Sequence, residues 1–142
     1  MQIKKHPLIG SIGLGIMGGA YARHLLSDGF AVTGFDIDAR RRSALKKLGG
    51  IPATTAAAVS AQCAIIVTSL PSIAAVNAAF FGKGGIVDSA KRGTVVIETS
   101  TLPLAVKHDI HERCAKRGIT VLDCPVSGTG AQAAARDIAI YA

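Results

Sequence analysis

The sequence contains no tryptophan, and only 4% of its residues are aromatic. That scarcity fits an aromatic-rich β-barrel poorly, whereas 16 glycines and many alanines suit helices packed closely on a sheet. Charged residues make up only 18% of the chain and hydrophobic residues 49%, which excludes a disordered protein or a coiled coil. A chain of 142 residues can bury one core, so we expect a single domain spanning residues 1–142.

Cysteines and long apolar runs are also few. Cys63, Cys114 and Cys124 form no C-x-x-C pair, and their odd number favours free thiols in a reducing compartment. Residues 1–7 are too short and polar for a signal or transit peptide, and the longest apolar runs are too short to span a membrane. We therefore predict a soluble cytoplasmic domain without a membrane partner.

The net charge of +7 raises the alternative of nucleic-acid binding. Apart from Arg40, Arg41 and Arg42, the positive charges are scattered, and few aromatic side chains lie among them to stack on bases. We predict no nucleic-acid partner. A steep dependence of binding on salt would identify one.

Short apolar runs typical of strands alternate with segments typical of helices. The expected strands are Leu8–Ile12, Ala31–Phe35, Ala64–Leu70, Thr94–Glu98 and Ile119–Leu122, and Ile138–Tyr141 has the pattern of a further strand. The expected helices are Met17–Ser27, Ala39–Leu48, an alanine-rich segment capped by Thr54 or Thr55 and ending near Gln62, Ser72–Phe80 and Leu104–Arg117. This alternation predicts an α/β fold, a Rossmann-like doubly wound and mainly parallel sheet.

A glycine-rich loop follows the first expected strand and opens the first expected helix. Its residues, Gly13, Leu14, Gly15, Ile16, Met17 and Gly18, fit the pattern G-x-G-x-x-G. In that context the first glycine permits a tight turn, the second admits a pyrophosphate, and the third lets the helix pack near the strand. We predict a dinucleotide-binding loop, and the alternative is a glycine-rich turn without a ligand.

Asp36 ends the second expected strand, 18 residues after Gly18, where an acidic side chain can accept hydrogen bonds from ribose hydroxyls. Its alternative role is to cap the next helix, a role that suits Asp38 better. An acid at this position favours NAD. NADP is the alternative, because one of the three arginines, with Arg40 as our candidate, could bind a 2′-phosphate.

Four segments in order resemble the β-hydroxyacid dehydrogenase family, which includes 3-hydroxyisobutyrate dehydrogenase and, more distantly, 6-phosphogluconate dehydrogenase. They are the Gly13–Gly18 loop, Thr68-Ser69-Leu70-Pro71, Glu98-Thr99-Ser100-Thr101, and Asp123-Cys124-Pro125-Val126-Ser127-Gly128. The resemblance implies hydride transfer between a nicotinamide cofactor and a small 3-hydroxy acid or its semialdehyde. It also implies that Leu70 and Pro71 border the cofactor and that Thr101 lies near the nicotinamide.

The last of these segments implies a substrate site. By the resemblance, Ser127 and Gly128 hold the substrate carboxylate, and Thr129 replaces a glycine of the family's turn, which would narrow the pocket. Without the resemblance, Ser127 and Gly128 are simply a turn.

The family's catalytic lysine has no counterpart here. It belongs to a Lys-x-x-Asn segment beyond the substrate loop, and no lysine follows Lys116 in this sequence. We therefore assign no catalytic residue to this chain. We expect it to be the cofactor-binding part of a longer two-domain, homo-oligomeric enzyme, whose helical second domain is absent, and to catalyse little alone. The alternative is a free-standing dinucleotide-binding or redox-sensing module.

A metal site is not expected either. His108, His111 and Cys114 fall on one expected helix, but His108 and Cys114 point about 120° apart and lie roughly 9 Å apart along its axis. They cannot converge on one tetrahedral ion. We predict that the histidines lie on the surface and that Cys114 lies in the core.

Overall fold

The computed structural model, which describes residues 6–142, contains a six-stranded sheet. Its strands are β1 (Leu8–Ile12), β2 (Ala31–Phe35), β3 (Ile51–Pro52), β4 (Ile65–Thr68), β5 (Val95–Glu98) and β6 (Thr120–Asp123). They run in the order β3-β2-β1-β4-β5-β6, and every neighbouring pair is parallel. This is the doubly wound order in which the connections reverse direction beside β1, and it confirms the predicted Rossmann-like fold.

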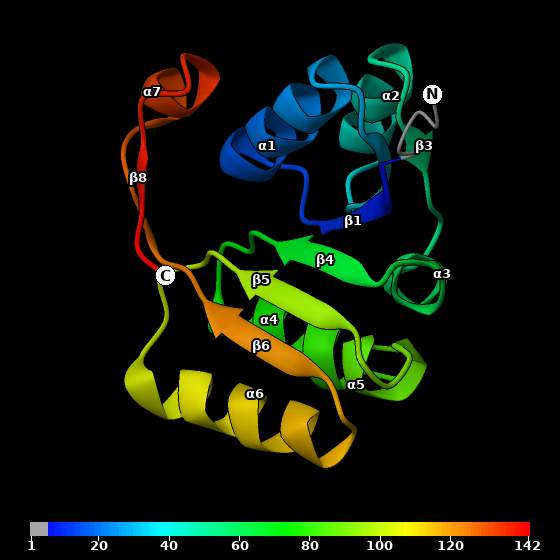
Figure 1. Ribbon diagram of the computed structural model, residues 1–142, viewed down its shortest axis with the longest axis vertical. Helices are drawn as coiled ribbons and strands as arrows, with labels where there is room; N and C mark the ends of the chain where they lie inside the picture. The colour runs from blue at the N-terminus through cyan, green and yellow to red at the C-terminus, as the bar shows by residue number, and fades with distance from the viewer. Residues whose placement is uncertain (1–5) are drawn as a thin grey trace, which may run out of the picture.

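Helices cover both faces of this sheet. They are α1 (Ile16–Ser27), α2 (Ala39–Lys47), α3 (Ala56–Gln62), α4 (Ile73–Phe81), α5 (Ile86–Ser89), α6 (Leu104–Lys116) and α7 (Gly130–Ala134). In Figure 1, α1 and α2 lie on one side of the sheet, and α4, α5 and α6 lie on the other. Each expected helix is present, with bounds within two residues of the prediction.

Two hydrophobic cores follow from the alternation of side chains along the strands. Ile9 of β1 packs with Leu14, Val32 and Leu45 under α1 and α2. Ile12 belongs to the larger core under α3 to α6, which includes Val59, Ile66, Phe80, Val96, Ile110 and Cys114. Because both faces are covered, the central strands are mostly apolar, as expected for a parallel sheet, and their buried polar residues Ser11, Thr68 and Glu98 lie at or near the carboxyl ends.

Short polar side chains fix where several helices begin. Asp38, Thr55 and Ser72 each accept a hydrogen bond from a backbone amide in the first turn of α2, α3 and α4. Such caps satisfy amides that have no partner inside the helix. The predictions that Asp38 caps the second helix and that Thr54 or Thr55 caps the third are confirmed, with Thr55 in that position.

The C-terminal segment folds back along α1 (Figure 1). Strands β7 (Val126–Ser127) and β8 (Ala139–Ile140) form an antiparallel pair separate from the main sheet, with α7 between them. The expected strand at 138–141 is thus β8. The His24 ring contacts the Ala133 carbonyl at 2.8 Å, and Arg136 forms two hydrogen bonds with Asp28 at 2.8 and 2.9 Å. We call residues 126–140 the C-terminal arm.

Candidate functional site

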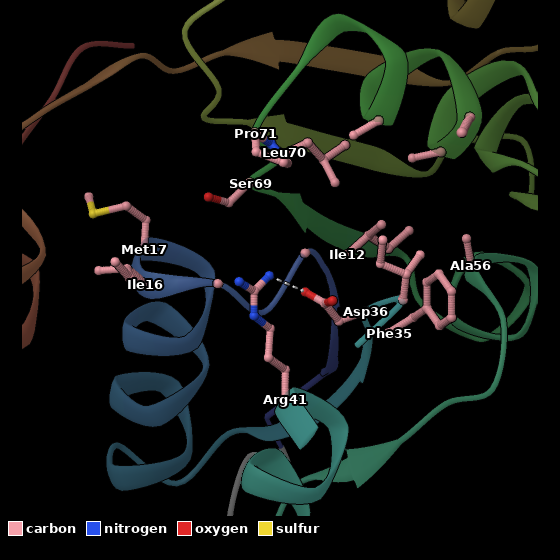
Figure 2. A pocket seen from close by; sticks show the side chains of 16 residues that line it. Ile12, Ile16, Met17, Phe35, Asp36, Arg41, Ala56, Ser69, Leu70 and Pro71 are labelled. Carbon is pink, nitrogen blue, oxygen red and sulfur yellow. Dashed lines mark hydrogen bonds and ion pairs between the residues drawn. The ribbon is translucent and has the colours of Figure 1, made fainter. Parts of the chain in front are cut away.

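A cavity of about 560 Å³ opens at the carboxyl ends of β1 and β4, where the strand order reverses. Open α/β sheets bind their ligands at this point. Figure 2 shows side chains of the loop after β1, the end of β2 and the turn after β4 surrounding it. Of the predicted cofactor residues, seven line the cavity: Gly13, Gly15, Ile16, Met17, Asp36, Leu70 and Pro71.

The three glycines of the loop differ in what surrounds them. Gly13 has φ +91°, and a Cβ there would lie 2.0 Å from the carbonyl oxygen of Ser69. A Cβ on Gly18 would lie 2.0 Å from the carbonyl oxygen of Gly13. At Gly15 the nearest atoms would be those of the Arg41 guanidinium, at 3.5 and 3.8 Å. The fold therefore requires Gly13 and Gly18, while Gly15 leaves open the space of the cavity.

The first turn of α1 faces this space. Gly15 is its N-cap residue and forms no side-chain cap, and the first turn contains no acidic residue. The first amides of a helix have no partner within it and carry the positive end of its dipole. This end of α1 is therefore suited to an anion such as a pyrophosphate.

Asp36 is buried and connects the two loops on this side of the cavity. Its Oδ2 accepts a hydrogen bond from the Leu14 amide at 2.8 Å, and its Oδ1 accepts one from the Asp38 amide at 2.8 Å. Arg41 approaches Oδ2 at 3.3 Å, as the dashed line in Figure 2 shows. A carboxylate offers about four acceptor positions, so capacity for a ribose hydroxyl remains. Leu14 packs in the smaller core and does not line the cavity.

The arginine at the cavity is Arg41. Arg40 turns away and pairs with Asp38 at 3.0 Å, with 91% of its side chain exposed. Arg42 bonds to the backbone oxygens of Asp36 and Ile37. Consecutive helical residues point about 100° apart, so of these two neighbours Arg41 lines the cavity and Arg40 does not.

The turn after β4 is tied to the turn after β5. The Leu70 amide donates to the Ser100 hydroxyl at 2.9 Å, and both the amide and the hydroxyl of Thr99 donate to the Thr68 carbonyl, at 3.0 and 2.8 Å. Thr101 follows directly and is exposed, outside the cavity lining.

The predicted substrate residues lie on the C-terminal arm and not in the cavity. Ser127 ends β7, and both it and Gly128 are exposed. Gly128 has φ +146°, and a Cβ there would lie 2.7 Å from the Ile138 side chain. Thr129 caps α7 in a capping box with Gln132. The arm meets the cavity mouth at Ile16, whose Cγ2 lies 2.2 Å from the position of a Cβ on Gly130.

Residues 8–142 match the family described as the NAD binding domain of 6-phosphogluconate dehydrogenase. The chain belongs to this family. A probable mitochondrial 3-hydroxyisobutyrate dehydrogenase of Dictyostelium discoideum is 34% identical over 128 residues, covering 90% of this chain and 40% of that protein.

Solved structures agree with this membership. The 3-hydroxyisobutyrate dehydrogenase of Mycobacterium tuberculosis superposes with a TM-score of 0.89 at 27% identity, over 95% of this chain and 45% of that one. Psf3, solved with NADP⁺ and 2-OPP, gives a TM-score of 0.88 at 25% identity, over 93% of this chain and 47% of that one. The chain therefore spans less than half the length of these relatives.

Beside the turn that holds Leu70 lies an ion cluster that the sequence analysis missed, in which Lys107 and Glu98 are buried and Asp123 is exposed. Lys107, only 8% exposed, donates to Glu98 Oε2 and to the Ser100 carbonyl, both at 2.9 Å, and to Asp123 Oδ1. Burial alone lowers the pKa of Lys107, but the carboxylates of Asp123 and Glu98 raise it above its usual value. The sequence feature that could have revealed it is the spacing of Lys107, Ile110 and Cys114, because this spacing places all three residues on one face of α6, the buried face.

The three cysteines are free, as expected, and all three are buried. Burial raises the pKa of Cys63 and of Cys114 to about 11. Burial, followed by the charge of Asp123, also raises the pKa of Cys124, so nothing activates this thiol in the predicted substrate segment.

His108 and His111 are exposed and Cys114 is buried, as predicted. Within residues 6–142, no three His, Cys, Asp or Glu side chains are grouped to hold a metal ion. In the same range, no helix is long and apolar enough to cross a membrane.

Proposed function

We propose that this NAD-binding domain belongs to an enzyme that moves a hydride between a nicotinamide cofactor and a small 3-hydroxy acid or its semialdehyde. The relatives named 3-hydroxyisobutyrate dehydrogenase support this reaction class. The observation that carries the proposal is Gly15: a Cβ at this position would meet only the end of the Arg41 side chain, so the fold does not require a glycine there, and the missing side chain leaves the cavity open.

The residues around the cavity fit a dinucleotide. The amides at the start of α1, from Gly15 to Gly18, would bind the pyrophosphate, and the Asp36 carboxylate would accept hydrogen bonds from the ribose. The small side chains of Ala56, Ala75 and Ala78 leave room for the adenine end. When bound, the nicotinamide ring supplies the site that accepts or gives the hydride.

The other end of the cofactor would lie beside the turns after β4 and β5. Leu70 and Pro71 border the cavity there, and Thr101 follows the turn that holds Leu70 through Ser100. Ser127 and Gly128, exposed on the arm near Ile16, would bind the substrate carboxylate through a hydroxyl and a backbone amide. The capping role of Thr129 fixes the end of this substrate turn.

We expect NAD(H) to bind more tightly than NADP(H). The buried Asp36 carboxylate would repel a 2′-phosphate, and Arg41 offsets that charge only in part, since 48% of its side chain is exposed to solvent.

Thermal unfolding of this chain during titration with NADH and with NADPH tests the proposal. At about 100 times Kd, a ligand that binds only the folded state adds about 2.7 kcal/mol to the free energy of unfolding. We expect NADH to raise Tm at lower concentration than NADPH. Absence of a shift with both would contradict the proposal, and a stronger shift with NADPH would contradict the preference.

The variant Gly15→Val makes the test specific to the site. A Cβ there would meet only the end of Arg41, so the free energy of unfolding without ligand should fall by no more than about 1 kcal/mol, the cost of an unfavourable residue at the N-cap of α1. Affinity for NADH should fall at least about tenfold because the pyrophosphate loses its close approach to the loop. The exposed Ala115→Val on α6 is the matched control and should bind NADH normally.

A further inference from the structure

Lys107 holds three separate chain segments through one ammonium group. Its acceptors are Glu98 at the end of β5, the Ser100 carbonyl in the following turn, and Asp123 at the end of β6. An ammonium has three donors, and each is used. A lysine is almost never this buried without partners, so its burial reflects these contacts.

The cluster fixes the turn after β5 from both sides. The Ser100 amide donates to Glu98 Oε1 at 2.9 Å, while the Ser100 carbonyl accepts from Lys107. The Ser100 hydroxyl in turn accepts a hydrogen bond from the Leu70 amide. One chain of hydrogen bonds therefore runs from Lys107 through Ser100 to Leu70, which lines the cavity.

We propose that Lys107 is a positioning residue that holds the Ser100–Thr101 turn and Leu70 where they receive the nicotinamide end of the cofactor. This inference rests on the proposed function, since it assigns that end of the cavity to the nicotinamide. Lys107 itself does not line the cavity, so it acts through its three acceptors.

A comparison of two ligands separates positioning from general stabilisation. ADP-ribose contains the adenosine, pyrophosphate and second ribose but lacks the nicotinamide, so the ratio of its Kd to that of NADH measures what the nicotinamide adds. A lysine that only stabilised the fold would change both affinities together or neither. A positioning lysine changes NADH binding and spares ADP-ribose.

The test uses the double variant Lys107→Met with Glu98→Gln, because removing Lys107 alone would leave a buried carboxylate without a cation. We expect the Kd of NADH to rise about tenfold, the equivalent of losing one well-placed hydrogen bond, while that of ADP-ribose stays within about twofold. NADH fluorescence titration and calorimetry with ADP-ribose provide the two constants. Lys116→Met is the control, since Lys116 lies on the same helix and pairs with Glu112 at 2.8 Å on the exposed surface.

A second variant, Lys107→Arg, keeps the positive charge and tests the positioning role if the double variant does not fold. A planar guanidinium cannot direct three donors from one nitrogen, so it should lose part of the nicotinamide contribution. The inference is overturned if either folded variant keeps the parent ratio, or if the parent binds NADH no more tightly than ADP-ribose. If the parent binds neither ligand, the proposed function fails and the inference fails with it.

Discussion

Asp36 serves the fold and is placed to serve the ligand. Its carboxylate accepts the Leu14 amide from the glycine-rich loop and the Asp38 amide from the turn into α2. The bond from Leu14 fixes the end of β2 against the loop after β1, the bond from Asp38 holds the turn into α2, and together they set one wall of the cavity. Replacing Asp36 would therefore lower both the stability of the fold and the affinity for a ligand, so such a variant cannot separate the two effects.

Arg41 is the better probe of cofactor choice. Its guanidinium lies beside both Asp36 Oδ2 and the open side of Gly15, where a 2′-phosphate on the adenosine ribose would come within reach. We expect Arg41→Ala to weaken NADPH binding by about tenfold or more, the worth of a charge-assisted hydrogen bond, and to change NADH binding much less. Parallel fluorescence titrations with both cofactors measure this. Arg40→Ala, which removes a neighbouring guanidinium bound to Asp38, is the control, and an equal loss of NADPH affinity there would contradict the assignment.

Sequence spacing predicted the cavity-lining glycines and Asp36, because each follows a strand whose carboxyl end must meet the others at one edge, whereas Leu70 and Pro71 were predicted from the family resemblance. Spacing could not distinguish Arg40 from Arg41, since a shift of one residue rotates a helical side chain by about 100°. Lys107 was missed for a different reason. Its three partners come from positions 98, 100 and 123, which only the folded sheet brings together.

Among the elements, the C-terminal arm is held by few contacts. Helix α7 has five residues and depends on its capping box, in which the Gln132 amide donates to the Thr129 hydroxyl and the Thr129 amide donates to the Gln132 side chain. Arg136 and Asp28 connect the arm to α1, and the hydrogen bond from Arg136 lowers the pKa of Asp28. This contact is therefore present above the ordinary aspartate pKa and is lost as pH falls through the lowered value.

We expect Thr129→Ala to loosen the arm without loosening the sheet. Losing a cap costs about 1 kcal/mol, a large share of the local stability of a five-residue helix. Hydrogen exchange followed by mass spectrometry should show faster exchange in peptides covering residues 126–140 and unchanged exchange in β1, β4 and β5. Thr55→Ala, which removes the cap of α3, should leave the arm protected. Uniformly faster exchange in Thr129→Ala would contradict a locally acting cap.

The strands of four or five residues and the helices of seven or more could be predicted from the sequence, and of the shorter elements only β8 was. Hydrophobic periodicity and capping residues located five of the strands in the main sheet and five of the helices. Strand β3 has two residues and α5 has four, which is too few for a period to show. Pro52 is tolerated in β3 because that strand is at the edge of the sheet.

At the scale of the whole molecule, the parallel sheet explains why site and ion cluster lie together. Strands β1, β2, β4, β5 and β6 all end at the same edge, so the glycine-rich loop, Asp36, the Leu70 turn, Glu98 and Asp123 share it. The opposite edge carries helix C-termini and turns such as Gly29 and Gly118. Function is therefore expected at one edge, while the buried thiols Cys63 and Cys114 belong to the core that supports it.

Those two thiols predict how the whole fold responds to alkaline pH. Each has an ordinary pKa of 9.0 that burial raises to about 11, so between these values the unfolded chain releases protons that the folded chain keeps. The free energy of unfolding must then fall as pH rises from about 9 to about 11. Lys107 also makes the free energy of unfolding fall as pH rises, but at higher pH. Its pKa in the folded chain lies above the ordinary lysine value of 10.5, so its stabilising contribution is lost only above that value.

Replacing both thiols, Cys63→Ala with Cys114→Ala, separates their share from that of Lys107. We expect the double variant to be less stable at pH 7 because it leaves cavities, yet to lose less stability than the parent between pH 8.5 and 10.5, about where the thiols of the unfolded chain titrate. Urea denaturation across this range gives both quantities. Val59→Ala, a cavity in the same core without a thiol, should lower stability and keep the parent's dependence on pH. If the double variant keeps that dependence as well, the thiols do not set the alkaline limit of the fold.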